Sequence, residues 1–94
     1  MHLDLAARPR LTRHARVRFD HRSGGHLLLS PERGLLLNPS AAQIVLSCNG
    51  QLSILEIARK LCAGASLELV VHDVLELLGE LGRRRLIEVA DPNP

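Results

Sequence analysis

The side chains best suited to chemistry are five histidines and two cysteines, scattered over a chain of 94 residues. No histidine stands at metal-ligand spacing from either cysteine; only His21 and His26, which a hairpin would bring face to face, offer a weak metal site. The simpler interpretation is a polar pair on a small sheet. His72 and Asp73 join a base to a carboxylate, but neighbouring helical positions point about 100° apart, and no nucleophile motif accompanies them. The sequence therefore predicts a protein that is not an enzyme and that holds no metal and no cofactor.

Composition excludes several further classes of protein. Phe19 is the only aromatic residue, so single-stranded nucleic acid has no stacking platform. No apolar run approaches the roughly 20 residues of a membrane-spanning helix, and Asp4 interrupts any signal-peptide core at once. We therefore expect a cytoplasmic protein with no membrane partner, in which Cys48 and Cys62 are reduced and buried thiols.

Positive charge is concentrated near the N-terminus. Six arginines against two aspartates give residues 1–22 a formal charge of +4, whereas six basic and eight acidic side chains give the remainder −2. Residues 1–14 include Pro9 and three arginines and show no clear periodicity, so we interpret them as a mobile basic arm. Such an arm could contact phosphate or an acidic peptide, or it could simply stay solvated.

Alternating polarity predicts three short strands after the arm. Along the first strand Val17 and Phe19 alternate with charged side chains, a pattern typical of a half-buried strand. Glycine-containing turns separate the strands. The expected strands cover residues 15–22, 26–30 and 35–37. Together they predict a three-stranded antiparallel meander.

Helical signals begin at Asn38. Asn38 is a favoured N-cap, and Pro39 fits the first helical position, where its missing N–H costs nothing. Ser53 and Glu56 form the capping-box pattern that opens a second helix. The two signals predict that the chain changes from strands to helices at Asn38.

A third and longest helix is expected over residues 66–82, followed by a short strand over residues 86–89. Its apolar positions fill an arc of about 160°. They are Leu67, Val70, Val71, Val74, Leu75, Leu77, Leu78 and Leu81. The outward face carries four carboxylates, no basic side chain and one stray apolar residue, Leu69. We expect the apolar arc to pack on the sheet and on the first two helices.

The predicted fold is a single α+β domain over residues 15–90, in which a three-stranded antiparallel meander precedes three helices. The arm, residues 1–14, and a tail, residues 91–94, flank it. This order of elements is winged helix-turn-helix-like, which makes DNA binding one candidate function. A recognition helix needs basic or amide side chains toward the bases. The carboxylates of the third helix repel DNA, so nucleic acid is the less favoured partner.

The open edge of so small a sheet is the stronger functional signal, because its N–H and C=O groups lack partners. A groove between that edge and a long helix could accept an extended peptide, with main-chain hydrogen bonds supplying affinity and side-chain pockets supplying specificity. The same edge could instead be covered by the arm or by a second copy of the chain. A C2 homodimer or a swapped N-terminal segment would then compete with the peptide.

A series of short motifs occurs in order along residues 8–89. They are Arg8-Pro9-Arg10-Leu11, Val17-Arg18-Phe19-Asp20, Leu28-Leu29-Ser30-Pro31-Glu32-Arg33, Leu37-Asn38-Pro39-Ser40-Ala41-Ala42-Gln43-Ile44, Cys48-Asn49-Gly50, Ile57 and Asp73-Val74. Taken as an ordered set, they resemble the pyrroloquinoline quinone (PQQ) biosynthesis protein D family, PqqD. The resemblance covers nearly the whole chain.

The resemblance implies a non-catalytic peptide chaperone, a recognition element of the kind found in ribosomal peptide modification pathways. It would bind the precursor peptide of PQQ and present it to a radical S-adenosylmethionine (SAM) enzyme, which cross-links a Glu to a Tyr. In this family the peptide adds a strand beside the third strand and packs on the third helix. The peptide-binding residues implied for this sequence are Gly34, Leu35, Leu36, Leu37, Leu67, Val70, Val71, Val74 and Leu78.

Overall fold

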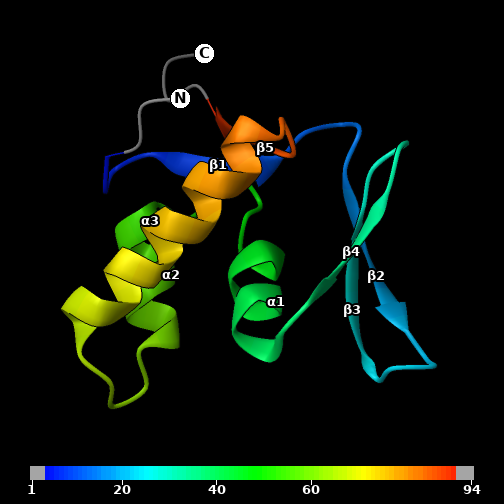
Figure 1. Ribbon diagram of the computed structural model, residues 1–94. Helices are drawn as coiled ribbons and strands as arrows, with labels where there is room; N and C mark the ends of the chain where they lie inside the picture. The colour runs from blue at the N-terminus through cyan, green and yellow to red at the C-terminus, as the bar shows by residue number, and fades with distance from the viewer. Residues whose placement is uncertain (1–3, 91–94) are drawn as a thin grey trace.

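The computed structural model describes residues 4–90. Within this range the chain forms two antiparallel sheets and three helices, and the expected α+β class is confirmed (Figure 1). The elements are β1 (Arg8–Leu11), β2 (Arg16–Asp20), β3 (Gly25–Leu29), β4 (Gly34–Leu37), α1 (Pro39–Leu46), α2 (Ile54–Leu61), α3 (Leu67–Arg83) and β5 (Ile87–Ala90). Two expected segments fall outside the described range: the first three residues of the arm, residues 1–3, and the whole tail, residues 91–94.

Strands β2, β3 and β4 form the predicted meander, in the spatial order β2-β3-β4. Between β3 and β4 the register places Leu28 opposite Leu35. The β2–β3 turn passes through Gly24 at a φ of 74°, a left-handed conformation that glycine adopts without strain. The Asp20 carboxylate accepts hydrogen bonds from the backbone N–H and the hydroxyl of Ser23 at 3.2 and 2.7 Å. The turn therefore holds the first hairpin in register.

The expectation of a mobile arm over residues 1–14 is wrong, because strand β1 lies within it. Strand β1 pairs antiparallel with β5, and the buried Pro9 lies opposite Val89. The Ala7 carbonyl accepts a 2.9 Å hydrogen bond from the backbone N–H of Ile54, which satisfies a free N–H of the first turn of α2. This segment is therefore a structural part of the domain.

The helix starts expected from the sequence are confirmed. The Asn38 side chain accepts a 2.8 Å hydrogen bond from the backbone N–H of Ala41 and caps α1. At α2, the Ser53 hydroxyl accepts from the Glu56 N–H at 3.1 Å, while the Glu56 carboxylate accepts from the Ser53 N–H at 2.9 Å. Helix α3 begins directly after Ser66, without a side-chain cap hydrogen bond.

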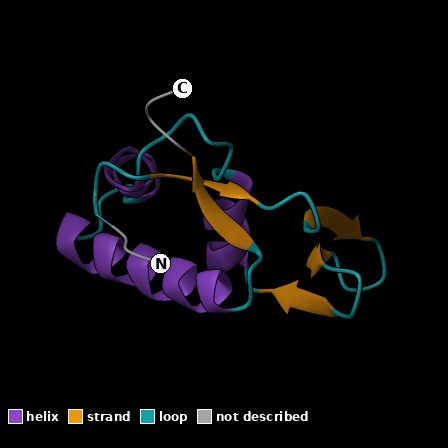
Figure 2. Ribbon diagram, turned by 90° about the horizontal axis from the view of Figure 1, so that it is seen from above, coloured by secondary structure: helices purple, strands orange, loops and turns teal. Residues whose placement is uncertain are grey.

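Helix α3 packs mainly against α2 and β5, whereas α1 contacts α2, β3 and β4. The β2-β3-β4 sheet lies to one side of the helices, with α1 between it and the α2–α3 pair (Figures 1 and 2). The expectation that the apolar arc of α3 packs on this sheet is therefore corrected. The side of α3 that carries Asp73 and Leu77 borders the start of α1.

Candidate functional site

Strand β4 is an edge strand, because among the described strands it pairs only with β3. The N–H of Ser30 donates to the carbonyl of Arg33 at 2.9 Å, which makes this pair a hydrogen-bonded one. Hydrogen-bonded and non-hydrogen-bonded pairs alternate along an antiparallel ladder, so Leu35 directs its N–H and C=O toward β3. Gly34 and Leu36 consequently direct theirs away from the sheet, toward the free edge.

Two surface hollows lie at opposite ends of β4. The first, of about 430 Å³, opens beside the β3–β4 turn, and its lining includes Arg33, Leu35, Arg84 and Leu86. The second, of about 300 Å³, lies between the start of α1 and the middle of α3, and its lining includes Ser40, Ala41, Ile44, Asp73, Glu76 and Leu77. Strand β4 runs from the first hollow toward the second, whereas α3 runs from the second hollow toward the first. We call the two hollows and the free edge of β4 between them the β4–α3 groove.

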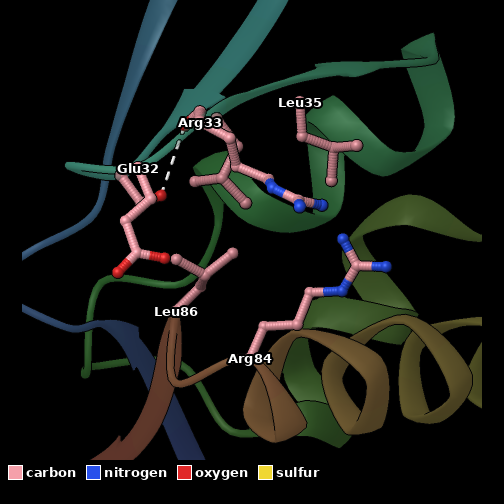
Figure 3. Close-up of a pocket in the computed structure, with 7 residues that line it drawn as sticks. Glu32, Arg33, Leu35, Arg84 and Leu86 are labelled. Atoms are coloured by element: carbon pink, nitrogen blue, oxygen red, sulfur yellow. Dashed lines mark hydrogen bonds between the residues drawn. The ribbon is translucent and has the colours of Figure 1, made fainter.

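The two ends of the groove carry opposite charge. At the first hollow the guanidinium groups of Arg33 and Arg84 point into the same space (Figure 3). At the second hollow Asp73 and Glu76 are exposed carboxylates on the lining. The groove is thus positive at the β3–β4 turn and negative at the start of α1.

Glu80 orients the positive end from α3. Its carboxylate accepts a hydrogen bond from Arg83 and one from the Arg84 Nε at 3.2 Å. The hydrogen bond from Arg83 lowers the pKa of the Glu80 carboxyl, with Arg84 adding to the effect. Glu80 is therefore ionised at neutral pH and holds the Arg84 side chain at the end of the helix.

Four of the predicted peptide-binding residues belong to β4. Three of them lie at the groove, either on its lining or with backbone groups on the free edge. Gly34 and Leu36 direct backbone groups to the free edge, and the Leu36 side chain is 57% exposed. Leu35 lines the first hollow. Leu37 is corrected: its side chain is only 5% exposed and belongs to the core.

Of the predicted peptide-binding residues of α3, two are enclosed in the core and three are partly exposed. Val74 and Leu78 are completely buried, so their side chains stabilise the domain and are not presented to a ligand. Leu67, Val70 and Val71 are half-buried and pack against the same core cluster. None of these five residues lines either hollow.

The α3 residues that do line the groove were missed. Asp73 and Leu77 line the second hollow and Arg84 the first, and spacings of four and seven residues place them on one helical side. Leu77 stands at the edge of the expected apolar arc, and Asp73 belongs to the neighbouring acidic face, which was expected to face solvent. The available signal was Leu69, which lies on it and is 66% exposed, as expected for an apolar residue that the core does not bury.

The other candidate chemistry does not converge on a site. The rings of His21 and His26 contact the Phe19 ring edge-on, with centroid distances of 5.0 and 5.4 Å. Over residues 4–90, no group of three or more His, Cys, Asp or Glu side chains is placed to hold a metal ion. Nor does this part of the chain contain a helix long and apolar enough to cross a membrane.

Both cysteines are free thiols. Cys48 is buried as expected, and burial raises the pKa of its thiol to about 12. Cys62 is only half-buried, which corrects the expectation that both thiols are enclosed. Neither cysteine lines the β4–α3 groove.

Known proteins share both the sequence and the fold. The family model described as Coenzyme PQQ synthesis protein D (PqqD) matches residues 25–87. A relative from Bradyrhizobium diazoefficiens, named PqqA binding protein, is 31% identical over 87 residues, covering 90% of this chain and 84% of the relative. The chain belongs to the PqqD family. The resemblance stated from the sequence motifs is thereby confirmed.

Two further PqqD proteins agree with this assignment, and another solved structure shares the fold. The bifunctional coenzyme PQQ synthesis protein C/D of Methylorubrum extorquens is 33% identical over 82 residues, which are 85% of this chain and 22% of that longer protein. The chain also matches the solution NMR structure of the PqqD part of Methylobacterium extorquens PqqCD, which is described as a functional, stand-alone recognition element for ribosomally synthesized and modified peptides. The TM-score is 0.79 at 30% identity, over 93% of this chain and 95% of that one. Lasso peptide synthetase B1, solved with its leader peptide, shares the fold, with a TM-score of 0.74 at 22% identity over 87% of this chain and 99% of that one.

Proposed function

We propose that this PqqD-family chain is a non-catalytic peptide chaperone that binds the precursor peptide of PQQ biosynthesis along the free edge of β4. Family membership and the relative named PqqA binding protein support the choice of peptide. The outward direction of the backbone groups of Gly34 and Leu36 carries the mechanism. An extended peptide laid along this edge pairs its own main chain with those groups and becomes a fourth strand of the sheet.

The groove supplies both components of peptide recognition. Each main-chain hydrogen bond to the edge contributes about 0.5–1.5 kcal/mol net and is independent of the peptide sequence. Leu35 and Leu86 line one hollow and Leu77 the other, so peptide side chains that point into the hollows meet apolar surface. The peptide sequence is therefore selected at the hollows, while the edge supplies general affinity for extended chain.

The bound peptide is then presented to a radical SAM enzyme in the cytoplasm. Strand addition supports this step, because it pairs one edge of the peptide and fixes it in an extended conformation. The opposite edge of the peptide and its flanking residues stay accessible to a second protein.

DNA binding by a winged-helix-like domain is the alternative that the order of elements suggests. A recognition helix would have to bring basic side chains to the phosphates. The exposed side of α3 instead carries Glu68, Asp73 and Glu76, and its basic residues are confined to the C-terminal end. The charge of α3 therefore favours a peptide over a duplex.

Calorimetric titration with synthetic PqqA peptide tests the proposal, together with a chemical-shift map of the bound state. We expect binding, with the largest shifts in β4, at the start of α1 and along Asp73 to Arg84 of α3. A random DNA duplex is the comparator. Duplex binding that weakens steeply with salt, together with no response to the peptide, would establish the alternative.

The predicted self-association uses the same edge of β4. Sedimentation of the free protein tests it, because a dimer formed through β4 would dissociate when PqqA peptide is added. A single species near the chain mass of 10.3 kDa at high concentration would rule the dimer out.

A further inference from the structure

We propose that the β4–α3 groove is electrostatically directional: it takes a peptide segment that places a carboxylate at the Arg33–Arg84 end and a basic side chain at the Asp73–Glu76 end. This inference rests on the proposed function, because it specifies which peptide the same groove selects. The four residues come from separate parts of the chain. Arg33 lies in the β3–β4 turn, Asp73 and Glu76 lie in α3, and Arg84 caps the C-terminus of α3.

The positive end combines three guanidinium groups with two carboxylates. Arg33 is exposed and forms no ion pair within the described residues, and its guanidinium points into the hollow beside that of Arg84 (Figure 3). The single carboxylate of Glu80 is shared between Arg83 and Arg84. Glu32 also lines this hollow, but its carboxylate points toward Leu86, away from the two guanidinium groups (Figure 3). A carboxylate entering from a peptide would therefore meet uncompensated positive charge.

The negative end has the opposite composition. Asp73 and Glu76 lie on the exposed side of α3, and no arginine or lysine lines this hollow. Asp73 has no ion-pair partner among the described residues. Glu76 has only His72, whose Nε2 lies 3.5 Å from its carboxylate and which carries charge only when protonated. A lysine or arginine of the peptide would neutralise the two carboxylates at this end.

The distance between the ends makes the two charges act separately. Strand β4 has four residues, which span about 13 Å at roughly 3.3 Å per residue. This exceeds the Debye length of about 8 Å at physiological ionic strength, so each end selects its own partner. The matching peptide therefore carries its acidic and basic residues about four positions apart in extended chain.

The expected effect on affinity is moderate, because all four side chains are exposed. An exposed ion pair changes affinity by a factor of about 1.5 to 5, and a like-charge contact weakens binding by a similar factor. Reversing the charge at both ends should therefore change affinity about tenfold or more. Most of the change should appear in the association rate and should shrink in high salt.

A charge-swapped protein tests the direction without altering net charge. The variant R33E/R84E/D73K/E76K exchanges the signs of the two ends, and all four positions are exposed. The two half-swapped variants, R33E/R84E and D73K/E76K, serve if the full swap does not fold, as judged by circular dichroism. The probes are synthetic PqqA peptide and the same peptide with every acidic residue replaced by Lys and every basic residue by Glu.

We expect the native protein to prefer PqqA and the charge-swapped protein to prefer the exchanged peptide, each about tenfold or more in low salt. Each half-swapped variant should lose part of the native preference. Equal affinity of both proteins for both peptides would overturn the directional groove and leave strand addition intact. Absence of binding between the native protein and either peptide would overturn the proposed function and this inference with it.

Discussion

Replacing Leu36 with proline removes one N–H from the outer edge of β4. Because that N–H points away from β3, the change breaks no hydrogen bond of the β2-β3-β4 sheet. Proline is tolerated on edge strands for this reason. The Leu36 side chain is 57% exposed, so its loss removes little core packing. The variant should therefore fold while presenting a damaged edge to the peptide.

The loss of peptide affinity follows from the missing donor. One hydrogen bond contributes about 0.5–1.5 kcal/mol, and leaving the peptide carbonyl without its partner adds about 1–3 kcal/mol. The proline ring also obstructs close approach of the peptide chain. The two contributions total about 1.5–4.5 kcal/mol, which corresponds to binding about 10- to 1,600-fold weaker, at about 1.4 kcal/mol per factor of ten.

Titration of PqqA peptide into the variant measures this loss, with circular dichroism to confirm the fold. Leu36→Ala is the matched control, because it removes the side chain but keeps the N–H. A second comparison replaces Arg8, Arg10 and Arg13 together by Gln, which should change affinity less and mainly in low salt. A folded Leu36→Pro variant that binds normally, beside a triple variant that does not bind, would refute strand addition at β4 and move the site to the N-terminal segment.

Three further predictions concern the thiols, the core of α3 and the cap of α2. Cys62 should react with Ellman's reagent at pH 8 while Cys48 reacts only after unfolding, because burial raises the pKa of Cys48 to about 12; equal labelling rates in the folded state would contradict this. Leu78→Ala should lower the free energy of unfolding by about 2–5 kcal/mol and leave the peptide affinity of the folded protein unchanged. Leu77→Ala should weaken peptide binding, because Leu77 lines the second hollow, and should cost less stability than Leu78→Ala, because Leu77 is only partly buried against the core. An affinity loss confined to Leu78→Ala would show that the core assignment is wrong. Hydrogen bonding to the N-cap N–H lowers the pKa of Glu56 below its ordinary 4.5, so its contribution to stability is present above that pH and lost as the pH falls through the lowered pKa. Glu56→Gln should therefore show a smaller acid-side fall in denaturation experiments than the native protein does.

Local signals predicted the helices and the meander because their chemistry is local. Asn38 caps a helix through an N–H three residues away, and the Ser53–Glu56 box spans a single turn. The pairing of β1 with β5 joins Arg8 to Ala90, and no pattern within either short strand specifies so distant a partner. Strand β1 has only four residues, one of which is Pro9, and so short a polarity pattern cannot distinguish a strand from a mobile arm.

Which side of α3 borders the groove could not be predicted, for a different physical reason. An apolar arc of about 160° is wider than one neighbouring element can cover, so the sequence leaves open which part of it a neighbour buries. In the structure α2 and β5 cover the part that contains Val74 and Leu78, and the sheet lies beyond α1. The side of α3 that carries Asp73 and Leu77, at the boundary between the apolar arc and the acidic face, borders the groove. The position of β4 at the edge of the sheet was easier to predict, because a meander leaves its last strand with a single partner.

Amide hydrogen exchange of β4, with and without PqqA peptide, tests the central claim most directly. In the free protein the amides of Leu35 and Leu37 should be protected by β3, while those of Gly34 and Leu36 should exchange quickly. On binding, the amides of Gly34 and Leu36 should become protected and complete an unbroken protected strand. Continued fast exchange at both positions in the peptide-saturated protein would contradict strand addition at β4.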